Sequence, residues 1–259
     1  MGAHEAVNAN GAFEYGVDEL TAVAEIVGAS AFPGVGEAPF SELSGEGRDA
    51  ALRSARRSLL AHGVLTIDDD GVLQIPPPHS ELFRVAFAPA LVMNAEHRRR
   101  DSIETRAYYA LPEVAVEHSV AVGGVHRLEP FAARELLNRV REFVMLVDRP
   151  AGDGEQVELP AEELSRALAK GELPAGAGAL GDALADLVAM SYVRCLHREG
   201  KAIVGGELRW IDTGEHGVWL IEPSQDDSDR VAVTRTAAAN LFDELLSYLP
   251  GAERQPAAT

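Results

Sequence analysis

The feature that most constrains this sequence is one structural pattern that occurs twice. Residues 102–146 and residues 205–249 each read as an alternating strand, a tight turn, two further strands and an amphipathic helix. The parallel extends upstream, where Glu96-His97-Arg98 has its counterpart in Leu196-His197-Arg198. A stacked solenoid needs at least about three repeats, so two copies favour a single quasi-twofold domain.

Antiparallel strands followed by a helix, twice over, predict an α+β fold. We expect a quasi-twofold internal duplication with a central, mostly antiparallel sheet flanked by helices. The expected organisation is a disordered leader over 1–16, a first half over 17–147, a linker over 148–157, a second half over 158–250 and a disordered tail over 251–259.

Local patterns place the elements of the first half. Helical spacing of apolar residues predicts helices at 18–27 and 48–62, and Asp-Gly between two β-branched runs predicts a hairpin over 64–75. A short helix follows from Ser80. We expect the later strands at 90–96, 102–110, 113–122 and 124–128, and then a helix that begins at Pro130.

The second half repeats this order with helices at its start. Pro160 marks a helix start that is rich in acidic residues. The remaining expected elements are a helix at 178–187, strands at 188–198, 203–212, 217–222 and 230–234, and a helix at 235–249. Both closing helices carry apolar stripes that we expect in the core: Leu136, Leu137, Val140 and Val144, and Leu241, Leu245 and Leu249.

Charge and cysteine content restrict the partners and the compartment. The net charge of −18 opposes binding to phosphate backbones and to anionic membranes. The sequence has no run of 18 apolar residues and no signal-like start, so we expect no membrane partner. The single Cys195 cannot form an internal disulfide, which favours a buried thiol in the cytoplasm.

No motif for catalysis or for cofactor binding stands out. The sequence contains no phosphate-binding glycine loop and no nucleophile elbow, and its eight histidines lack metal-ligand spacing. His118 and His126 form the nearest pair, which we interpret as structural. We therefore expect a protein that is not an enzyme and that holds no cofactor and no metal.

One alternative function rests on residues 48–75. A helix at 48–62 followed by a hairpin has the order of a winged-helix recognition helix and wing, with Arg53, Arg56 and Arg57 on DNA phosphates. The acidic chain and the Gly/Pro-rich loop in place of the preceding helix oppose this reading. A transcriptional regulator stays the alternative hypothesis.

The order of elements resembles the EspG family, the cytosolic chaperones of type VII (ESX) secretion, over nearly all of residues 17–250. The residues that carry the resemblance are Leu59, Gly63, Val64, Leu65, Asp68–Asp70, Leu82, Phe83, Ala86, Phe87, Ala88, Pro89 and the strand 90–96. The resemblance implies a quasi-twofold fold. It also implies an ATP-independent chaperone that binds the apolar tip of a helical secretion substrate, a PE–PPE pair in the best-known cases.

The partner-binding surface is expected on the sheet face that the helices leave uncovered. Its apolar candidates are Tyr108, Val116, Trp210, Trp219 and Ile221, with a core position for the two tryptophans as the open alternative. Arg98, Arg99 and Arg100 are the candidates for an acidic client rim. Their loop, 96–102, is shorter than in the family, which favours a simpler client such as a two-helix hairpin. The sequence leaves monomer and dimer equally open.

Overall fold

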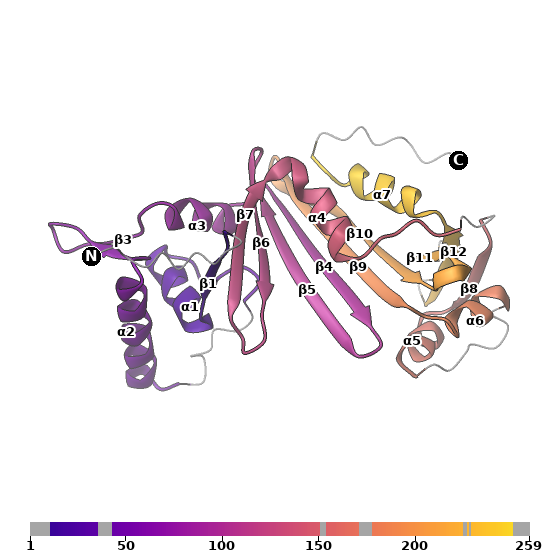
Figure 1. Cartoon of the computed structure of the whole chain (residues 1–259), viewed down its shortest axis with the longest axis horizontal. Helices are drawn as coiled ribbons and strands as arrows, with labels where there is room; N and C mark the ends of the chain where they lie inside the picture. Colours follow the sequence, from indigo (N-terminus) through magenta and orange to yellow (C-terminus); the bar gives the residue numbers. More distant parts are fainter. Residues whose placement is uncertain are drawn as a thin grey trace. The chain divides into compact units, whose positions relative to one another are not determined.

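The structure is a computed structural model that describes residues 11–35, 43–150, 154–170, 178–224, 227 and 229–250 (Figure 1). Its larger sheet has ten strands in the order β1-β7-β6-β5-β4-β9-β10-β11-β12-β8. The second five strands of this order mirror the first five: β4 and β9 begin two similar four-strand meanders, and the short strands β1 and β8 end the two sides. The described residues also form seven α-helices. The predicted α+β class, with a mostly antiparallel sheet flanked by helices, is confirmed.

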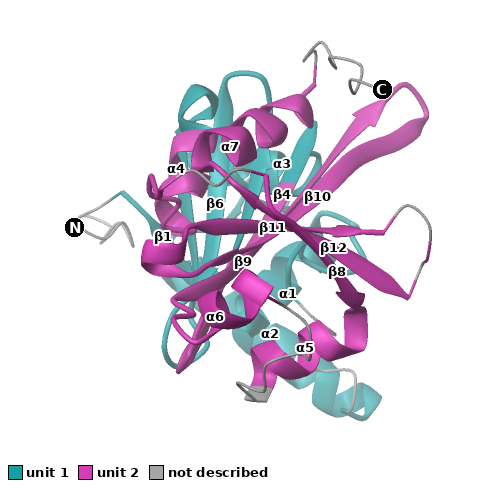
Figure 2. Ribbon diagram, turned by 90° about the vertical axis from the view of Figure 1, so that its right-hand side faces the viewer, with its two compact units in different colours: residues 1–92, 106–136 teal, residues 93–105, 137–259 magenta. Residues whose placement is uncertain are grey.

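Two compact units divide the chain (Figure 2). Unit 1 comprises residues 1–92 and 106–136, and unit 2 comprises residues 93–105 and 137–259. The division therefore does not coincide with the expected boundary between sequence halves at 147 and 148. The tip of the β4–β5 hairpin groups with the later part of the chain.

Unit 1 packs three helices against a meander of strands. Its helices are α1 (Val17–Ile26), α2 (Gly45–Ala61) and α3 (His79–Phe87). Its strands are β1 (Phe13–Tyr15), β2 (Thr66–Ile67), β3 (Leu73–Gln74), β6 (Val114–Val120), β7 (His126–Ala132) and the end of β5 (Ser102–Ala110). The short 3-10 helix η1 (Ala133–Glu135) follows β7.

Local chemistry explains two elements that the sequence predicted in unit 1. In α2, Leu52, Ala55 and Leu59 are buried at helical spacing, and Ser44 accepts the N–H of Gly47 as the N-cap. In the β2–β3 hairpin, Oδ1 of Asp68 accepts the N–H groups of Asp70 and Val72. These hydrogen bonds lower the pKa of the Asp68 carboxyl.

Unit 2 contains the remaining helices and the long central hairpins. Its helices are α4 (Leu136–Phe143, from Leu137 on), α5 (Ala161–Lys170), α6 (Gly178–Leu184) and α7 (Ala238–Ser247). Its strands are β4 (Leu91–Arg99, from Met93 on), the start of β5, β8 (Gln156–Pro160), β9 (Ala189–Glu199), β10 (Ala202–Asp212), β11 (Val218–Pro223) and β12 (Arg230–Thr236). A 3-10 helix, η2 (Gly214–His216), links β10 to β11.

The expected leader and linker need correction where the structure describes them. Residues 13–15 of the leader form β1, which pairs with β7 and buries Phe13 and Tyr15. The end of the linker forms β8, which pairs with β12 from Gln156. Residues 1–10, 151–153 and the expected tail, 251–259, lie outside the described residues.

Pro130 does not begin the helix that follows β7. It lies inside β7, opposite Val116 of β6, and the helical turn starts only at Ala133. A proline at one strand position removes one N–H from the ladder, which a strand tolerates where that N–H would face away from its partner. The stretch before α4 is therefore a strand of seven residues.

Candidate partner-binding surface

The central strands of unit 2 have two unlike faces. His97 of β4 and Ser191 of β9 are buried and joined by a hydrogen bond of 2.9 Å, so they share one face, here called the covered face. Because side chains alternate along a strand, every second residue shares this side. The other buried residues of this face are Met93, Ala95, Ala189, Val193, Cys195, Leu208 and Trp210.

Helices α4 and α7 pack on the covered face. The ring of Phe143 from α4 lies 6.4 Å from that of His97, and the Sγ of Cys195 lies 3.5 Å from the carbonyl oxygen of Tyr248 at the end of α7. The two helices lie side by side in Figures 1 and 2, with the Arg141 guanidinium 5.8 Å from the Phe242 ring centre. Burial lowers the pKa of His97 and raises the pKa of the Cys195 thiol to about 11.

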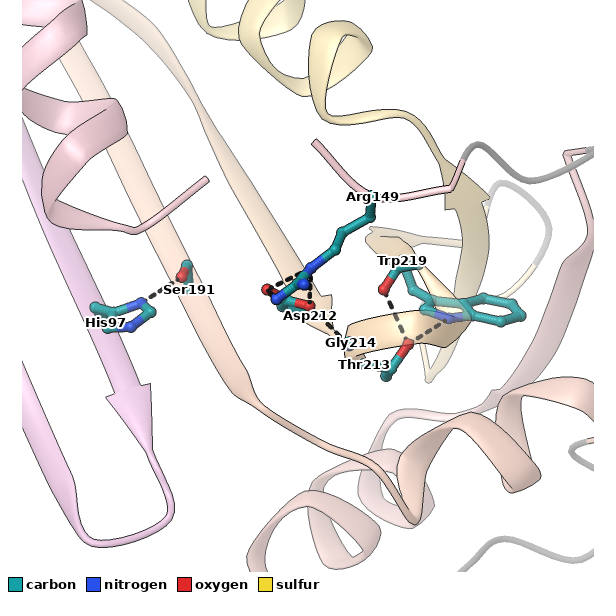
Figure 3. A network of polar contacts seen from close by, with 8 residues as sticks. His97, Arg149, Ser191, Asp212, Thr213, Gly214 and Trp219 are labelled. Carbon is teal, nitrogen blue, oxygen red and sulfur yellow. Dashed lines mark hydrogen bonds and ion pairs between the residues drawn. The ribbon is translucent and has the colours of Figure 1, made fainter. Parts of the chain in front are cut away.

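A polar network fixes the end of β10 beside these helices (Figure 3). The Arg149 guanidinium donates to both carboxylate oxygens of Asp212, at 2.9 to 3.3 Å, and Asp212 also accepts the N–H of Gly214. Next to it, the Thr213 hydroxyl donates to the Gly217 carbonyl and accepts the indole N–H of Trp219. A bidentate pair and a satisfied buried indole hold the β10–β11 connection rigidly.

The opposite side of the same strands is here called the open face. Arg99 reaches Glu104 at 3.4 Å, which puts Glu104 on the side of Arg99 and His97, so Ile103 and Thr105 point the other way. None of the open-face residues is buried. They are Asn94, Glu96 and Arg98 of β4, Ile103 and Thr105 of β5, Tyr192, Arg194, Leu196 and Arg198 of β9, and Ile203, Gly205, Glu207 and Arg209 of β10.

The open face ends where α5 and α6 begin to cover the sheet. Past Arg209, Ile211 of β10 and Trp219 of β11 are buried against leucines of these helices, among them Leu164 and Leu180. On this side of the β9–β10 hairpin, the base is therefore apolar and covered by α5 and α6. The part toward the tip is not covered by these helices. Ile203, near the tip, is 71% exposed.

Two glutamates of the open face already form ion pairs with arginines of the same face. Glu207 accepts hydrogen bonds from Arg209 at 2.8 Å and from the Tyr192 hydroxyl at 3.0 Å, and the Arg209 guanidinium stacks 5.3 Å from the Tyr192 ring centre. Partial burial and Glu207 raise the pKa of Tyr192. Glu96 pairs with Arg98 at 3.3 Å. Four arginines against two paired glutamates make this face locally basic on an acidic chain.

Four of the predicted apolar contact residues lie in the core instead. Tyr108, Val116, Trp210 and Trp219 are at most 2% exposed. Trp210 lies on the covered face and Trp219 packs under α5 and α6, because helices flank the sheet on both sides near β10 and β11. Ile221 is half-buried against the Trp219 cluster. Ile221 is opposite Arg209 in the β10–β11 ladder, so it lies at the border of the open face, whereas the other four side chains are not exposed on it.

The three predicted arginines occupy different positions at the β4–β5 tip. Arg98 lies on the open face, Arg99 pairs with Glu104 on the other side, and Arg100 stands in the turn. Sequence reasoning missed Arg194, Leu196, Arg198 and Ile203. The alternation in Tyr192–Arg198, with bulky polar and apolar residues between Val193, Cys195 and His197, is the signal that could have identified them.

The alternative DNA-binding segment places carboxylates close to its arginines and at its hairpin tip. Arg56 of α2 is held by Glu25 at 2.6 Å, and the Nε of Arg57 donates to the Arg53 carbonyl. The tip of the β2–β3 hairpin, which would be the wing, exposes Asp68, Asp69 and Asp70. Three carboxylates beside a DNA backbone would be repelled, so the structure does not favour this function.

The His118–His126 pair is a buried hydrogen-bonded contact in unit 1. Nε2 of His118 lies 2.8 Å from Nδ1 of His126. Burial and the neighbouring His126 lower the pKa of His118 to about 4. Within the described residues, no group of three or more histidine, cysteine or carboxylate side chains is placed to hold a metal ion.

Comparisons with known proteins identify the fold. No protein-family model matches the chain, and no curated protein matches its sequence. Among solved structures, the chain is similar to the Mycobacterium tuberculosis type VII secretion system chaperone EspG5, solved in complex with the PE25–PPE41 dimer. The TM-score is 0.56 at 14% sequence identity, over 93% of this chain and 98% of that one.

The match extends over almost the whole of both chains. No helix among the described residues is long and apolar enough to cross a membrane. The chain has an EspG-like fold.

Proposed function

We propose that this protein is a cytosolic, ATP-independent chaperone or adaptor of type VII secretion. It binds the apolar tip of a helical secreted client and keeps that tip from aggregating before export. The client is a PE–PPE-like pair or a two-helix hairpin. The proposal assigns no catalytic step and no cofactor to the protein.

The observation that carries this proposal is the open face of unit 2. An exposed apolar helix end is an aggregation hazard, and covering it needs an apolar patch with a polar rim. Ile103, Leu196 and Ile203 supply apolar surface, and the arginines around them supply the rim. The EspG-like fold adds support, because EspG5 has been solved with a PE–PPE dimer bound.

Rigidity of the surface also supports a binding role. The open face is backed by α4 and α7 and is tied at its base by the Arg149–Asp212 pair. A surface that is ordered before binding loses little conformational entropy in the complex. The client's tip therefore docks on a preformed platform.

The test is co-expression with the helical secreted proteins of the same organism, followed by affinity capture and mass measurement of the complex. Ile203→Asp should abolish capture of the client that wild-type protein binds. Ile67→Asp is the matched control, because Ile67 is also a strand residue and is 59% exposed, but it belongs to unit 1 and is not part of this face. No stoichiometric client for the wild type, or equal capture by both variants, would refute the proposal.

A further inference from the structure

The β9–β10 hairpin carries an ordered ladder of side-chain pairs on its open face. From base to tip, the paired residues are Tyr192 with Arg209, Arg194 with Glu207, Leu196 with Gly205, and Arg198 with Ile203. Each pair is one step of this ladder. The step formed by Leu196 and Gly205 has a single, apolar side chain and lies between two steps that each carry an arginine. We infer that this ladder selects a client helix end in which an apolar side chain is flanked by carboxylates. The inference rests on the proposed function and specifies its partner.

The apolar step is shaped by the backbone. A Cβ at Gly205 would overlap the carbonyl of Cys195 on β9, so only glycine fits where these two strands approach. Because position 205 carries no side chain, Leu196 has no cross-strand side-chain neighbour on the open face, and Ile203 is the next residue of β10 on that face. At this step an apolar side chain of a partner would pack against Leu196 and Ile203.

The side chains of the two arginines that flank this apolar step are uncommitted. Arg194 and Arg198 are exposed, and neither side chain makes a hydrogen bond or an ion pair with the part of the chain that the structure describes. Glu207, the nearest carboxylate to Arg194 across the ladder, is already bonded to Arg209 and Tyr192. Two guanidinium groups are thus available for carboxylates of a partner.

Their spacing suits a helix end. Residues four apart on a strand are separated by roughly 13 Å, and flexible arginine side chains close part of that distance. Carboxylates three or four residues apart on a helix lie about 5–6 Å from each other at Cβ, and they spread further at their tips. The negative end of the helix dipole adds to the attraction when a helix C-terminus faces the arginines.

An acidic protein fits this surface better than a nucleic acid does. A chain of charge −18 repels a long polyanion, whereas a few carboxylates on a helix end act only at short range. Leu196 and Ile203 also offer nothing to a phosphate backbone. We therefore assign the arginines to protein carboxylates.

The test uses three synthetic helix–turn–helix peptides that share one leucine-bearing tip. The residues beside the leucine are two Glu, two Gln or two Lys. We expect the Glu peptide to bind the full-length protein about tenfold more tightly than the Gln peptide, and the Lys peptide to bind most weakly. Raising the salt from about 50 to 300 mM should remove most of this difference.

Protein variants complete the test. Arg194→Gln with Arg198→Gln should make the Glu and Gln peptides bind alike, whereas Arg100→Gln, in the β4–β5 turn, should leave the preference intact. Equal binding of the three peptides, no binding by any, a preference for Lys, or tighter binding of duplex DNA than of the Glu peptide would overturn the inference. The co-expression experiment judges the proposed function separately, since a client captured through Ile203 without salt sensitivity would leave that function standing.

Discussion

At the residue scale, a buried chain of hydrogen bonds joins three polar side chains in unit 1. The Tyr109 hydroxyl donates to the Pro33 carbonyl at 2.8 Å and lies 3.4 Å from Nδ1 of His118, whose Nε2 contacts His126. Since the hydroxyl proton is used on Pro33, Nδ1–H of His118 must donate to Tyr109. Nε2 of His118 then accepts Nδ1–H of His126, and the chain of hydrogen bonds holds only while His118 is neutral.

We predict that unit 1 loses stability on mild acidification. The pKa of His118 is about 4 in the folded state against 6.5 for a free histidine, so the unfolded chain binds the proton more strongly between these values. The full free energy of unfolding should be retained above pH 6.5. It should decrease as the pH drops toward 4, and this group should account for a loss of up to about 3 kcal/mol.

Denaturant unfolding at several pH values tests this dependence. His118→Gln should flatten the pH dependence of the free energy of unfolding. His62→Gln, at an exposed histidine, should retain it. If His118→Gln unfolds with the wild-type pH profile, the hydrogen-bonded chain does not depend on neutral histidines.

Trp219 provides a second residue-scale prediction. It is 1% exposed and its indole N–H is satisfied by Thr213, so Trp219→Ala should lower the free energy of unfolding by about 3–5 kcal/mol. Ile203→Ala, at an exposed position, should change it by less than about 0.5 kcal/mol. A folded Trp219→Ala variant that loses only client binding would contradict this prediction and would show that Trp219 is part of the binding surface.

At the element scale, α7 depends on a glycine in the sheet below it. A Cβ at Gly206 would overlap the ring of Tyr248, so the end of α7 packs where β10 has no side chain. Gly206→Ala should destabilise the protein by about 1–3 kcal/mol through overpacking.

A double-mutant cycle separates this contact from a general effect on β10. Tyr248→Ala removes the ring that an alanine at position 206 would meet, so Gly206→Ala should cost much less in that background. If the losses of unfolding free energy in Gly206→Ala and Tyr248→Ala simply add in the double variant, the two positions do not interact.

Elements with local signals were predictable from the sequence, and elements that depend on distant pairing were not. The apolar spacing of α2 and the Asp-Gly turn of the β2–β3 hairpin are contained in a few consecutive residues, and both were predicted. Strands β1 and β8 are short, and each exists because it pairs with a strand far away in the sequence. Local composition cannot reveal such partners.

The candidate site was predictable only in outline for the same reason. Trp210 and Trp219 look alike as large aromatic residues in strands, and which helices cover them is decided by packing of distant segments. Arg98 was identified through the basic run beside it. The alternation along β9 separates Arg194 and Arg198 from the buried residues, but the sequence alone does not say that α4 and α7 cover the other face.

At the scale of the whole molecule, the two halves share connectivity but differ in surface chemistry. His97-Arg98 and Ile103 correspond to His197-Arg198 and Ile203 in the matching hairpins. Leu196, however, corresponds to Glu96, which already pairs with Arg98. Of these two hairpins, the β9–β10 hairpin alone therefore carries the basic and apolar ladder.

A single ladder predicts one client per chain. Light scattering coupled to size-exclusion chromatography should give the mass of one protein chain plus one client. A complex with two clients per chain would mean that the β4–β5 hairpin binds as the β9–β10 hairpin does, against the divergence at Glu96.

The most direct measurement of the binding surface uses the two lysines of the chain, Lys170 and Lys201. Lys201 lies in the turn of the β9–β10 hairpin, two residues before Ile203, and Lys170 ends α5. Acetylation rates should be measured by mass spectrometry with and without saturating client. The account predicts that Lys201 is protected in the complex while Lys170 keeps its rate, and an intact complex in which Lys201 reacts as fast as in the free protein would contradict it.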